Sequence, residues 1–322
     1  MRSGLFHTYP SRSETRIEGR SRRGTRRTLL SSLGAGSAAA LLAACGGAPS
    51  GGQITDRGST AGSANGLLVQ PVIPGTDTAV GRNRFALAIL QVGKGGALPA
   101  PLAEADLSLR FFHPIEPQPV AKGEAKPEFR YVTDKTKGLY IAQVQFDQPG
   151  AWGVEVSGTA AGQPLATARV QFQVKPRAET PAIGAPAPRS RNLTRHDVDD
   201  IKKIDSGATP NDMHEVSIAQ ALELKKPLVV LFASPGFCAT QTCAPQLGEV
   251  QKLKTKYGDR ASFVHVEIFK DTTTRAPYEA VVEWGLTSEP WTFLVDKEGK
   301  IAEKYEGPAP IEEMEAALAK LV

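Results

Sequence analysis

The chain of 322 residues is about twice the length of a typical domain, and its 31 Gly and 24 Pro indicate that part of this length is linker rather than core. The net charge of +4 arises at one end, because residues 1–27 carry eight Arg against two Glu, and the rest of the chain has a net charge of about −2. No basic stripe remains on that part, so the composition excludes a nucleic-acid-binding protein.

An export signal is predicted in residues 1–44. Arg26 and Arg27 precede the apolar and small residues of "TLLSSLGAGSAAALLAA", which is the order of a cationic region, a short apolar region and a small-residue cleavage site. This run contains Gly34 and Gly36 and is too short and too weakly apolar for a stable transmembrane span. We therefore expect export rather than a spanning anchor.

The end of this signal, Leu42-Ala43-Ala44-Cys45, resembles the lipobox of bacterial lipoproteins, whose cysteine is acylated and becomes the mature N-terminus. The resemblance implies a lipid anchor at Cys45 and a location at the outer face of the cytoplasmic membrane. The paired arginines resemble a twin-arginine signal, and the general secretory route remains an alternative.

Short strands are predicted in residues 67–174. Apolar residues alternate with polar ones in about seven runs, for example Tyr140, Ala142 and Val144, and a period of two indicates strands with one buried face. The number of runs favours an all-β, immunoglobulin-like sandwich. This region contains no cysteine, so we expect no inter-sheet disulfide, and we interpret the domain as a spacer or partner-docking module.

Two stretches without a core pattern flank the predicted sandwich. Residues 45–66 are rich in Gly, Ser and Ala and are predicted to be a flexible tether. Residues 175–204 begin with four Pro in "KPRAETPAIGAPAPRSRN" and are predicted to be a linker and approach segment.

The last segment, residues 205–322, alternates helix and strand patterns. Ser217, with Gln220 three places later, forms a capping box at the start of a helix. The all-apolar run "PLVVLFAS" suits a strand that is buried on both faces. A helix over 245–258, the strand "ASFVHVEIF", a helix ending at Gly285, the hairpin around "KEGK" and an amphipathic final helix follow. This order predicts an α/β domain with a mixed sheet and helices on both faces.

Residues 217–322 resemble the thioredoxin-like superfamily, most closely its membrane-tethered thiol reductants. The resemblance rests on the buried strand that leads into "FCATQTCAP", the helix after it, "EPWTFLVDKEGK" and the C-terminal helix. It implies that Pro290 is a cis proline beside the redox cysteines. It also implies thiol-disulfide exchange with protein thiols or disulfides at the outer face of the membrane, without a cofactor.

Cys238 and Cys243 are the candidate redox pair, because a lipidated Cys45 has no thiol. A helix N-terminus lowers the pKa of a nearby thiol, and a second cysteine can then resolve the mixed disulfide.

The role of each cysteine depends on the alignment with the superfamily. When residues are counted from the end of the buried strand, Cys238 takes the place of the superfamily's first cysteine, so we assign Cys238 as the nucleophile and Cys243 as the resolver. The superfamily pattern is C-x-x-C, whereas this chain has C-x4-C, so a second alignment is possible. It places Cys243-Ala-Pro on the superfamily's Cys-Gly-Pro, and the two cysteines would then exchange their roles. Residues five apart on a helix could not form a disulfide, so we expect the oxidised pair in a non-helical loop and an earlier helix start on reduction.

A binding module is one alternative, in which the same loop docks a partner or delivers copper, with Cys238, Cys243 and His265 as soft ligands and His214 as a further candidate. The simpler expectation is that His265 is a core histidine and that His214 is solvated in a loop. A permanent disulfide that only closes the loop is a second alternative.

A peroxiredoxin-like peroxidase is the third alternative, because "SPGFCATQTC" resembles the active-site loop of one subgroup. Pro235 and Pro290, however, stand where that family has its Thr and Arg. The sequence therefore favours a thiol-disulfide oxidoreductase over the three alternatives.

Overall fold

The computed structural model describes residues 67–322 except 74, 93–99, 134–136, 240–241 and 272. The predicted export signal, Cys45 and the tether lie outside the described residues. No helix of the described part is long and apolar enough to cross a membrane.

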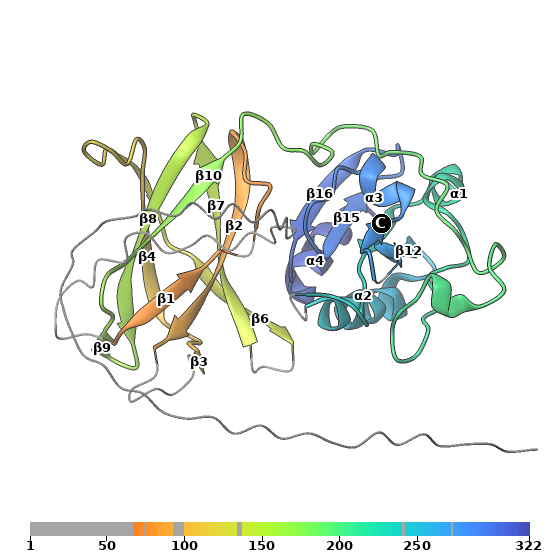
Figure 1. Cartoon of the computed structure of the whole chain (residues 1–322), viewed down its shortest axis with the longest axis horizontal. Coiled ribbons are helices and arrows are strands. Elements are labelled where there is room, and N and C mark those ends of the chain that lie inside the picture. Colours follow the sequence, from red (N-terminus) through yellow and green to blue (C-terminus); the bar gives the residue numbers. More distant parts are fainter. Residues whose placement is uncertain (1–66, 74, 93–99, 134–136, 240–241, 272) are drawn as a thin grey trace, which may run out of the picture. The chain divides into compact units, whose positions relative to one another are not determined.

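The first part of the described chain consists of two five-stranded antiparallel sheets (Figure 1, orange to green). One sheet has the order β1-β2-β7-β6 with β3 beside β2, and the other has the order β10-β8-β4-β5 with β9 beside β8. The strands are β1 Val69–Val72, β2 Gly81–Gln91, β3 Ala100–Pro101, β4 Asp106–Phe112, β5 Ala121–Ala125, β6 Glu128–Thr133, β7 Lys137–Phe146, β8 Gly150–Ala160, β9 Gln163–Pro164 and β10 Ala168–Val174.

The two sheets share one core because alternate residues of their strands are apolar. In β4, Leu107, Leu109 and Phe111 are buried, and the residues between them are exposed. Phe111 meets Phe85 of the other sheet edge to face, with ring centroids 5.2 Å apart, so the sheets pack face to face. The predicted strand-rich region is confirmed, and its immunoglobulin-like topology stays a prediction.

The last part of the chain is built on a four-stranded sheet of order β12-β11-β15-β16. β11 is parallel to β12 and antiparallel to β15, so the sheet is mixed, as predicted. The elements are the 3₁₀ helix η2 Ile201–Lys203, α1 Ile218–Glu223, β11 Leu228–Phe232, α2 Cys243–Tyr257, β12 Ser262–Val266, β13 Phe269–Asp271, β14 Ala276–Pro277, α3 Glu279–Glu283, β15 Trp291–Val295, β16 Ile301–Glu306 and α4 Ile311–Leu318.

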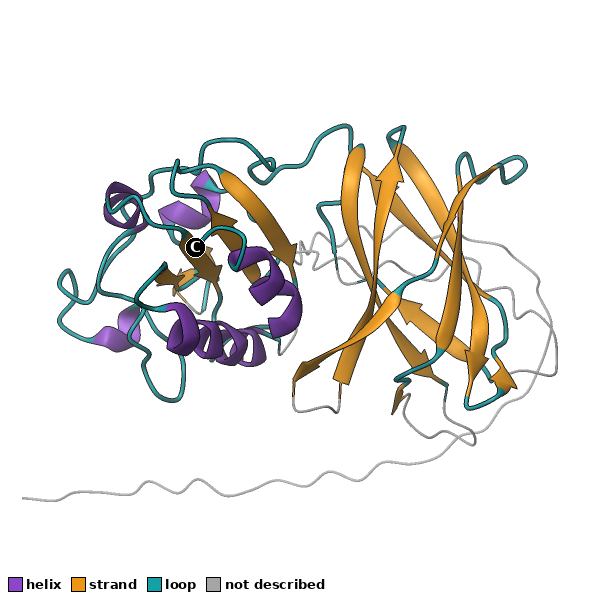
Figure 2. Ribbon diagram, turned by 180° about the vertical axis from the view of Figure 1, so that it is seen from behind, coloured by secondary structure: helices purple, strands orange, loops and turns teal. Residues whose placement is uncertain are grey.

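Helices cover both faces of this sheet because β11 is apolar throughout (Figure 2). Leu228, Val230 and Phe232 join the core that contains residues of α1 and α3. Val229 and Leu231 point to the opposite face and join the core that contains residues of α2 and α4. The α/β arrangement predicted for the last segment is therefore confirmed.

The helix ends follow local sequence signals. Ser217 accepts a hydrogen bond from the Gln220 N–H, and the Gln220 side chain accepts one from the Ser217 N–H, which is the predicted capping box. α2 begins at Cys243, two residues before the predicted start. Pro245 is compatible with this start because the first turn of a helix has no intrahelical partner for its N–H groups. α2 is capped at Gly258, as predicted.

Replacing the cap tests this local signal. We expect Ser217→Ala to lower the free energy of unfolding by about 1 kcal/mol, because the first turn of α1 loses an acceptor for its N–H groups. Urea denaturation followed by circular dichroism measures the change. Ser108→Ala, at an exposed position in β4, serves as control, and a Ser217→Ala curve that matches the control would contradict the prediction.

Candidate active site in the cysteine loop

The cysteine loop joins the carboxyl end of β11 to the start of α2. β11 ends at Phe232, and Cys243 is the first residue of α2. Cys238 lies before the helix, so the two cysteines do not share a helical segment. That the oxidised pair lies in a non-helical loop stays a prediction, because the two thiols are not joined here. The thiol at the helix N-terminus is therefore that of Cys243. The alignment from the strand end had instead predicted the nucleophile Cys238 at this position.

The two thiols differ in exposure. Cys243 is completely buried in the core on the α2 face, and Cys238 is half-buried at the edge of the same core. The two sulfurs are not joined in a disulfide. Both sulfurs and a carboxylate oxygen of Glu289 lie within 4.8 Å of one another. One thiol is thus accessible to a partner, and the other is screened from solvent directly beside it.

The surroundings of Cys243 disfavour its thiolate. A hydrogen bond with Cys238 is the largest cause that raises the pKa of the Cys243 thiol, and burial and the negative charge of Glu289 raise it further. The Ser234 N–H, two residues after the end of β11, lowers the pKa of the Cys243 thiol. At neutral pH the buried thiol is therefore protonated.

Glu289 and Arg275 hold the chain on both sides of Cys238. Glu289 Oε1 accepts hydrogen bonds from Ala239 N, at 3.1 Å, and from Arg275 Nη2, at 3.0 Å. Arg275 Nη1 donates to the carbonyl oxygen of Phe237 at 3.1 Å. The ion pair thereby fixes the residue before and the residue after Cys238.

Burial raises the pKa of Glu289, while the Ala239 N–H and Arg275 lower it. Neither Glu289 nor Arg275 was among the site residues predicted from the sequence. For Glu289 a signal was available, because it precedes Pro290, and the Glu289–Pro290 peptide bond is cis. Pro290 therefore has the conformation that the resemblance implied, and its neighbour reaches the two sulfurs.

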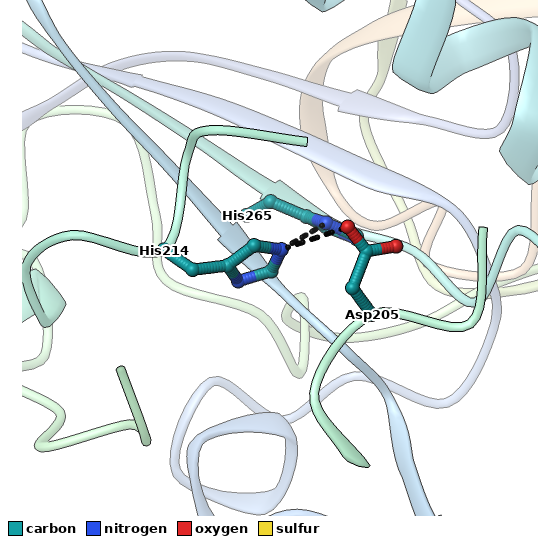
Figure 3. Close-up of side chains that lie close together, drawn as sticks. All are labelled: Asp205, His214 and His265. Carbon is teal, nitrogen blue, oxygen red and sulfur yellow. Dashed lines mark hydrogen bonds and ion pairs between the residues drawn. The ribbon is translucent and has the colours of Figure 1, made fainter. Parts of the chain in front are cut away.

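A second group of side chains lies apart from the cysteine loop and consists of Asp205, His214 and His265 (Figure 3). All three are at most 2 % exposed. His214 Nε2 lies 3.3 Å from Asp205 Oδ2 and 3.2 Å from His265 Nδ1. Asp205 and His214 come from the segment before α1, and His265 comes from β12.

This second group changes the expectations for the histidines. His265 is a core histidine, as the simpler expectation had it, and it groups with Asp205 and His214 rather than with the two sulfurs. The expectation that His214 is solvated is wrong. Its segment pairs with the sheet, where the His265 N–H donates to the Met213 carbonyl oxygen at 2.9 Å, and this contact carries His214 into the interior.

The ionisation states of the group follow from its contacts. Burial raises the pKa of Asp205, but hydrogen bonds from His214, Asn211 and Gly207 outweigh it and lower the pKa to about 2. Burial and then the neighbouring His214 lower the pKa of His265 to about 4. At neutral pH Asp205 is therefore ionised and His265 is neutral.

Comparisons with known proteins identify the fold of the last segment. Residues 215–321 match the family model described as a thioredoxin-like domain, which confirms the resemblance for this part of the chain. No curated protein matches the chain.

Two solved structures illustrate the similarity. A putative thiol:disulfide interchange protein DsbE from Chlorobium tepidum is 14% identical with a TM-score of 0.32, and the match covers 44% of this chain and 99% of that one. A DsbF homologue from Corynebacterium diphtheriae is 16% identical with a TM-score of 0.29, and the match covers 37% of this chain and 83% of that one.

Neutralising Glu289 tests the electrostatics of the loop. We expect Glu289→Gln to lower the pKa of Cys243, because a negative charge beside a thiol disfavours the thiolate. The amide oxygen of Gln can still accept the Ala239 N–H. Alkylation by iodoacetamide across a pH series, read by mass spectrometry at each cysteine, measures the shift.

The control for this experiment is Glu223→Gln, at the exposed end of α1, where Glu223 pairs with Arg189. Its alkylation profile should match that of the wild type. A Glu289→Gln profile that superimposes on the control would show that Glu289 does not influence the thiols.

Proposed function

We propose that this chain is an exported, lipid-anchored protein whose thioredoxin-like domain exchanges disulfides with protein thiols through Cys238 and Cys243. The observation that carries the proposal is the meeting of both sulfurs within 4.8 Å, together with the Glu289 carboxylate, in the loop that enters α2. For a disulfide to form, the two sulfurs would have to approach to about 2.05 Å.

The unequal exposure of the thiols supports separate roles. The half-buried Cys238 is accessible to a partner, so we assign it the attack on the partner's disulfide. This step forms a mixed disulfide and releases one partner thiolate. Cys243 then loses its proton and attacks the Cys238 sulfur, which forms the Cys238–Cys243 disulfide and releases the second partner thiol. Two electrons pass from the pair to the partner, and the reverse reaction oxidises a partner dithiol.

The loop is less suited to copper delivery. The third donor near the two sulfurs is the carboxylate of Glu289, and His265 belongs to the other group. Copper(I) prefers soft sulfur donors, and carboxylates suit harder cations. We therefore place thiol exchange above copper binding.

The same geometry argues against a peroxidase. In the part of the chain that the structure describes, the arginine at the cysteine loop is Arg275, and its guanidinium is engaged by Glu289 and by the Phe237 carbonyl oxygen. A guanidinium held in this way is paired with a carboxylate rather than presented to a peroxide.

The rest of the chain supports an extracytoplasmic setting. Residues 1–44 carry the export signal pattern and Cys45 follows the lipobox pattern, so the proposed anchor is at Cys45. The strand-rich region, which we propose to be an immunoglobulin-like sandwich, acts as a spacer or docking module. Partner thiols or disulfides would then be those at the outer face of the membrane.

Serine variants separate the two cysteine roles. We expect Cys238→Ser to abolish exchange with a small aromatic disulfide, and Cys243→Ser to form a mixed disulfide that persists. In the wild type the second step should accelerate as pH rises, because the raised pKa of Cys243 keeps its thiol protonated at neutral pH. Stopped-flow absorbance and mass spectrometry of the trapped species measure these steps.

Two outcomes would speak against these assignments. A persistent mixed disulfide in Cys238→Ser, with no reaction in Cys243→Ser, would reverse the roles. Exchange at the wild-type rate in both variants would refute the proposed function.

The anchor is tested independently by Cys45→Ser. We expect the wild-type chain in the membrane fraction of a bacterial host and the Cys45→Ser chain in the aqueous fraction, because the variant cannot be acylated at this position. Incorporation of labelled fatty acid gives a second readout. Equal labelling of both chains would contradict a lipid at Cys45.

A further inference from the structure

The group of Asp205, His214 and His265 presents three donor atoms to one point. Figure 3 shows the three side chains pointing toward one another, with His214 Nε2 facing both partners at 3.2 and 3.3 Å. In a tetrahedral zinc site with metal–ligand bonds of 2.0–2.1 Å, neighbouring ligand atoms lie about 3.3 Å apart. The two distances from His214 Nε2 therefore match edges of such a site, and all three donor atoms lie within 4.8 Å of one another.

The position of the ring hydrogen of His265 leaves its Nδ1 lone pair available to a cation. His265 Nε2 lies 3.1 Å from the Ala233 carbonyl oxygen, and a nitrogen that faces a carbonyl oxygen must carry the hydrogen. Nδ1 therefore presents a lone pair to His214 and Asp205. A bond from the second ring nitrogen to a backbone carbonyl is also the usual support of a metal-binding histidine.

His214 supplies an independent observation. Its Nδ1 atom is buried without a hydrogen-bond partner among the described residues. In this structure Nε2 donates to Asp205 Oδ2 at 3.3 Å. With the hydrogen moved to Nδ1, Nε2 would present a lone pair to the point that His265 Nδ1 and Asp205 Oδ2 face. A cation at this point would then be bound by three lone pairs.

The surroundings suit a divalent ion. Asp205 contributes one negative charge, and its Oδ1 atom is fixed by the Gly207 N–H at 2.9 Å. A cavity of about 180 Å³ borders His214 and His265 and also touches Glu267, which is 3 % exposed. The cavity has room for a water ligand, and Glu267 brings a further acidic group near the buried charge.

We infer that Asp205, His214 and His265 bind a divalent cation of the zinc type at a site separate from the cysteine loop. Two imidazole nitrogens and one carboxylate oxygen form a donor set of intermediate softness, which suits zinc better than copper(I) or calcium. The cation would fasten the segment before α1 to β12.

Asn211 competes with the cation. Its Nδ2 atom donates to Asp205 Oδ2 at 2.8 Å and lies 2.9 Å from His265 Nδ1. The amide therefore hydrogen-bonds with two of the three atoms that would bind the cation. Its Oδ1 atom accepts the Met213 N–H at 2.9 Å. Asn211→Asp would keep this acceptor and turn the competing amide into a fourth ligand.

The test uses the full-length chain with Cys238→Ser and Cys243→Ser, so that no thiolate at the loop binds metal and the result is independent of thiol exchange. After removal of metals with a chelator, zinc is titrated against a fluorescent competitor, and cobalt(II) absorption reports the donor type. We expect one equivalent of zinc and a cobalt spectrum without sulfur-to-metal charge transfer.

Two further substitutions move the affinity in opposite directions. Asp205→Asn should weaken zinc binding at least about tenfold, since the removal even of groups that only support ligands has effects of 10–100-fold. Asn211→Asp should tighten it by a similar factor. Without zinc, Asn211→Asp should lower the melting temperature, because two carboxylates face each other, and zinc should restore it.

Asp197→Asn is the matched control, because Asp197 is exposed in the same approach segment and bonds Thr194. Its zinc affinity should equal that of the background chain. The inference is overturned if the background chain binds no zinc, or if Asn211→Asp binds zinc no more tightly and is not restabilised by it. The second result decides the question even if Asp205→Asn fails to fold.

Discussion

The burial of β11 is the constraint on which both sites depend. Its five residues are completely buried between two helical layers, and the strand is paired on both sides, with β12 and with β15. The chain that leaves its carboxyl end is therefore held in place. Ala233 accepts the hydrogen bond from His265, and the next residue, Ser234, directs its N–H to the Cys243 thiol. Two neighbouring residues thus orient the cysteine loop on one side and the histidine group on the other.

Much of this arrangement could be predicted from the sequence. The all-apolar run of β11, the Ser217 capping box and the alternation in residues 67–174 are local signals, and a local signal identifies an element without knowledge of its neighbours. The proximity of Cys238 and Cys243 was also expected, since only a short loop separates them. These predictions needed no information about distant parts of the chain.

The polar surroundings of the sites could not be predicted in the same way. The segment before α1 pairs with β12, and this pairing brings together Asp205, His214 and His265. No periodic pattern in that segment predicts the pairing. Arg275 lies more than 30 residues after Cys238 and reaches the loop because β13 and β14 fold back toward it. Contacts of this kind depend on the tertiary fold, and the residue types involved are common on protein surfaces.

The start of α2 at Cys243 has a consequence for the energetics of electron transfer. Cys238 stays outside the helix while both thiols are reduced, so a bond between the sulfurs does not require the helix to unwind. In the proposed exchange, oxidation of the pair would therefore leave α2 intact. The reduction potential of the pair relative to that of the compartment then decides whether the protein gives or takes electrons in this exchange.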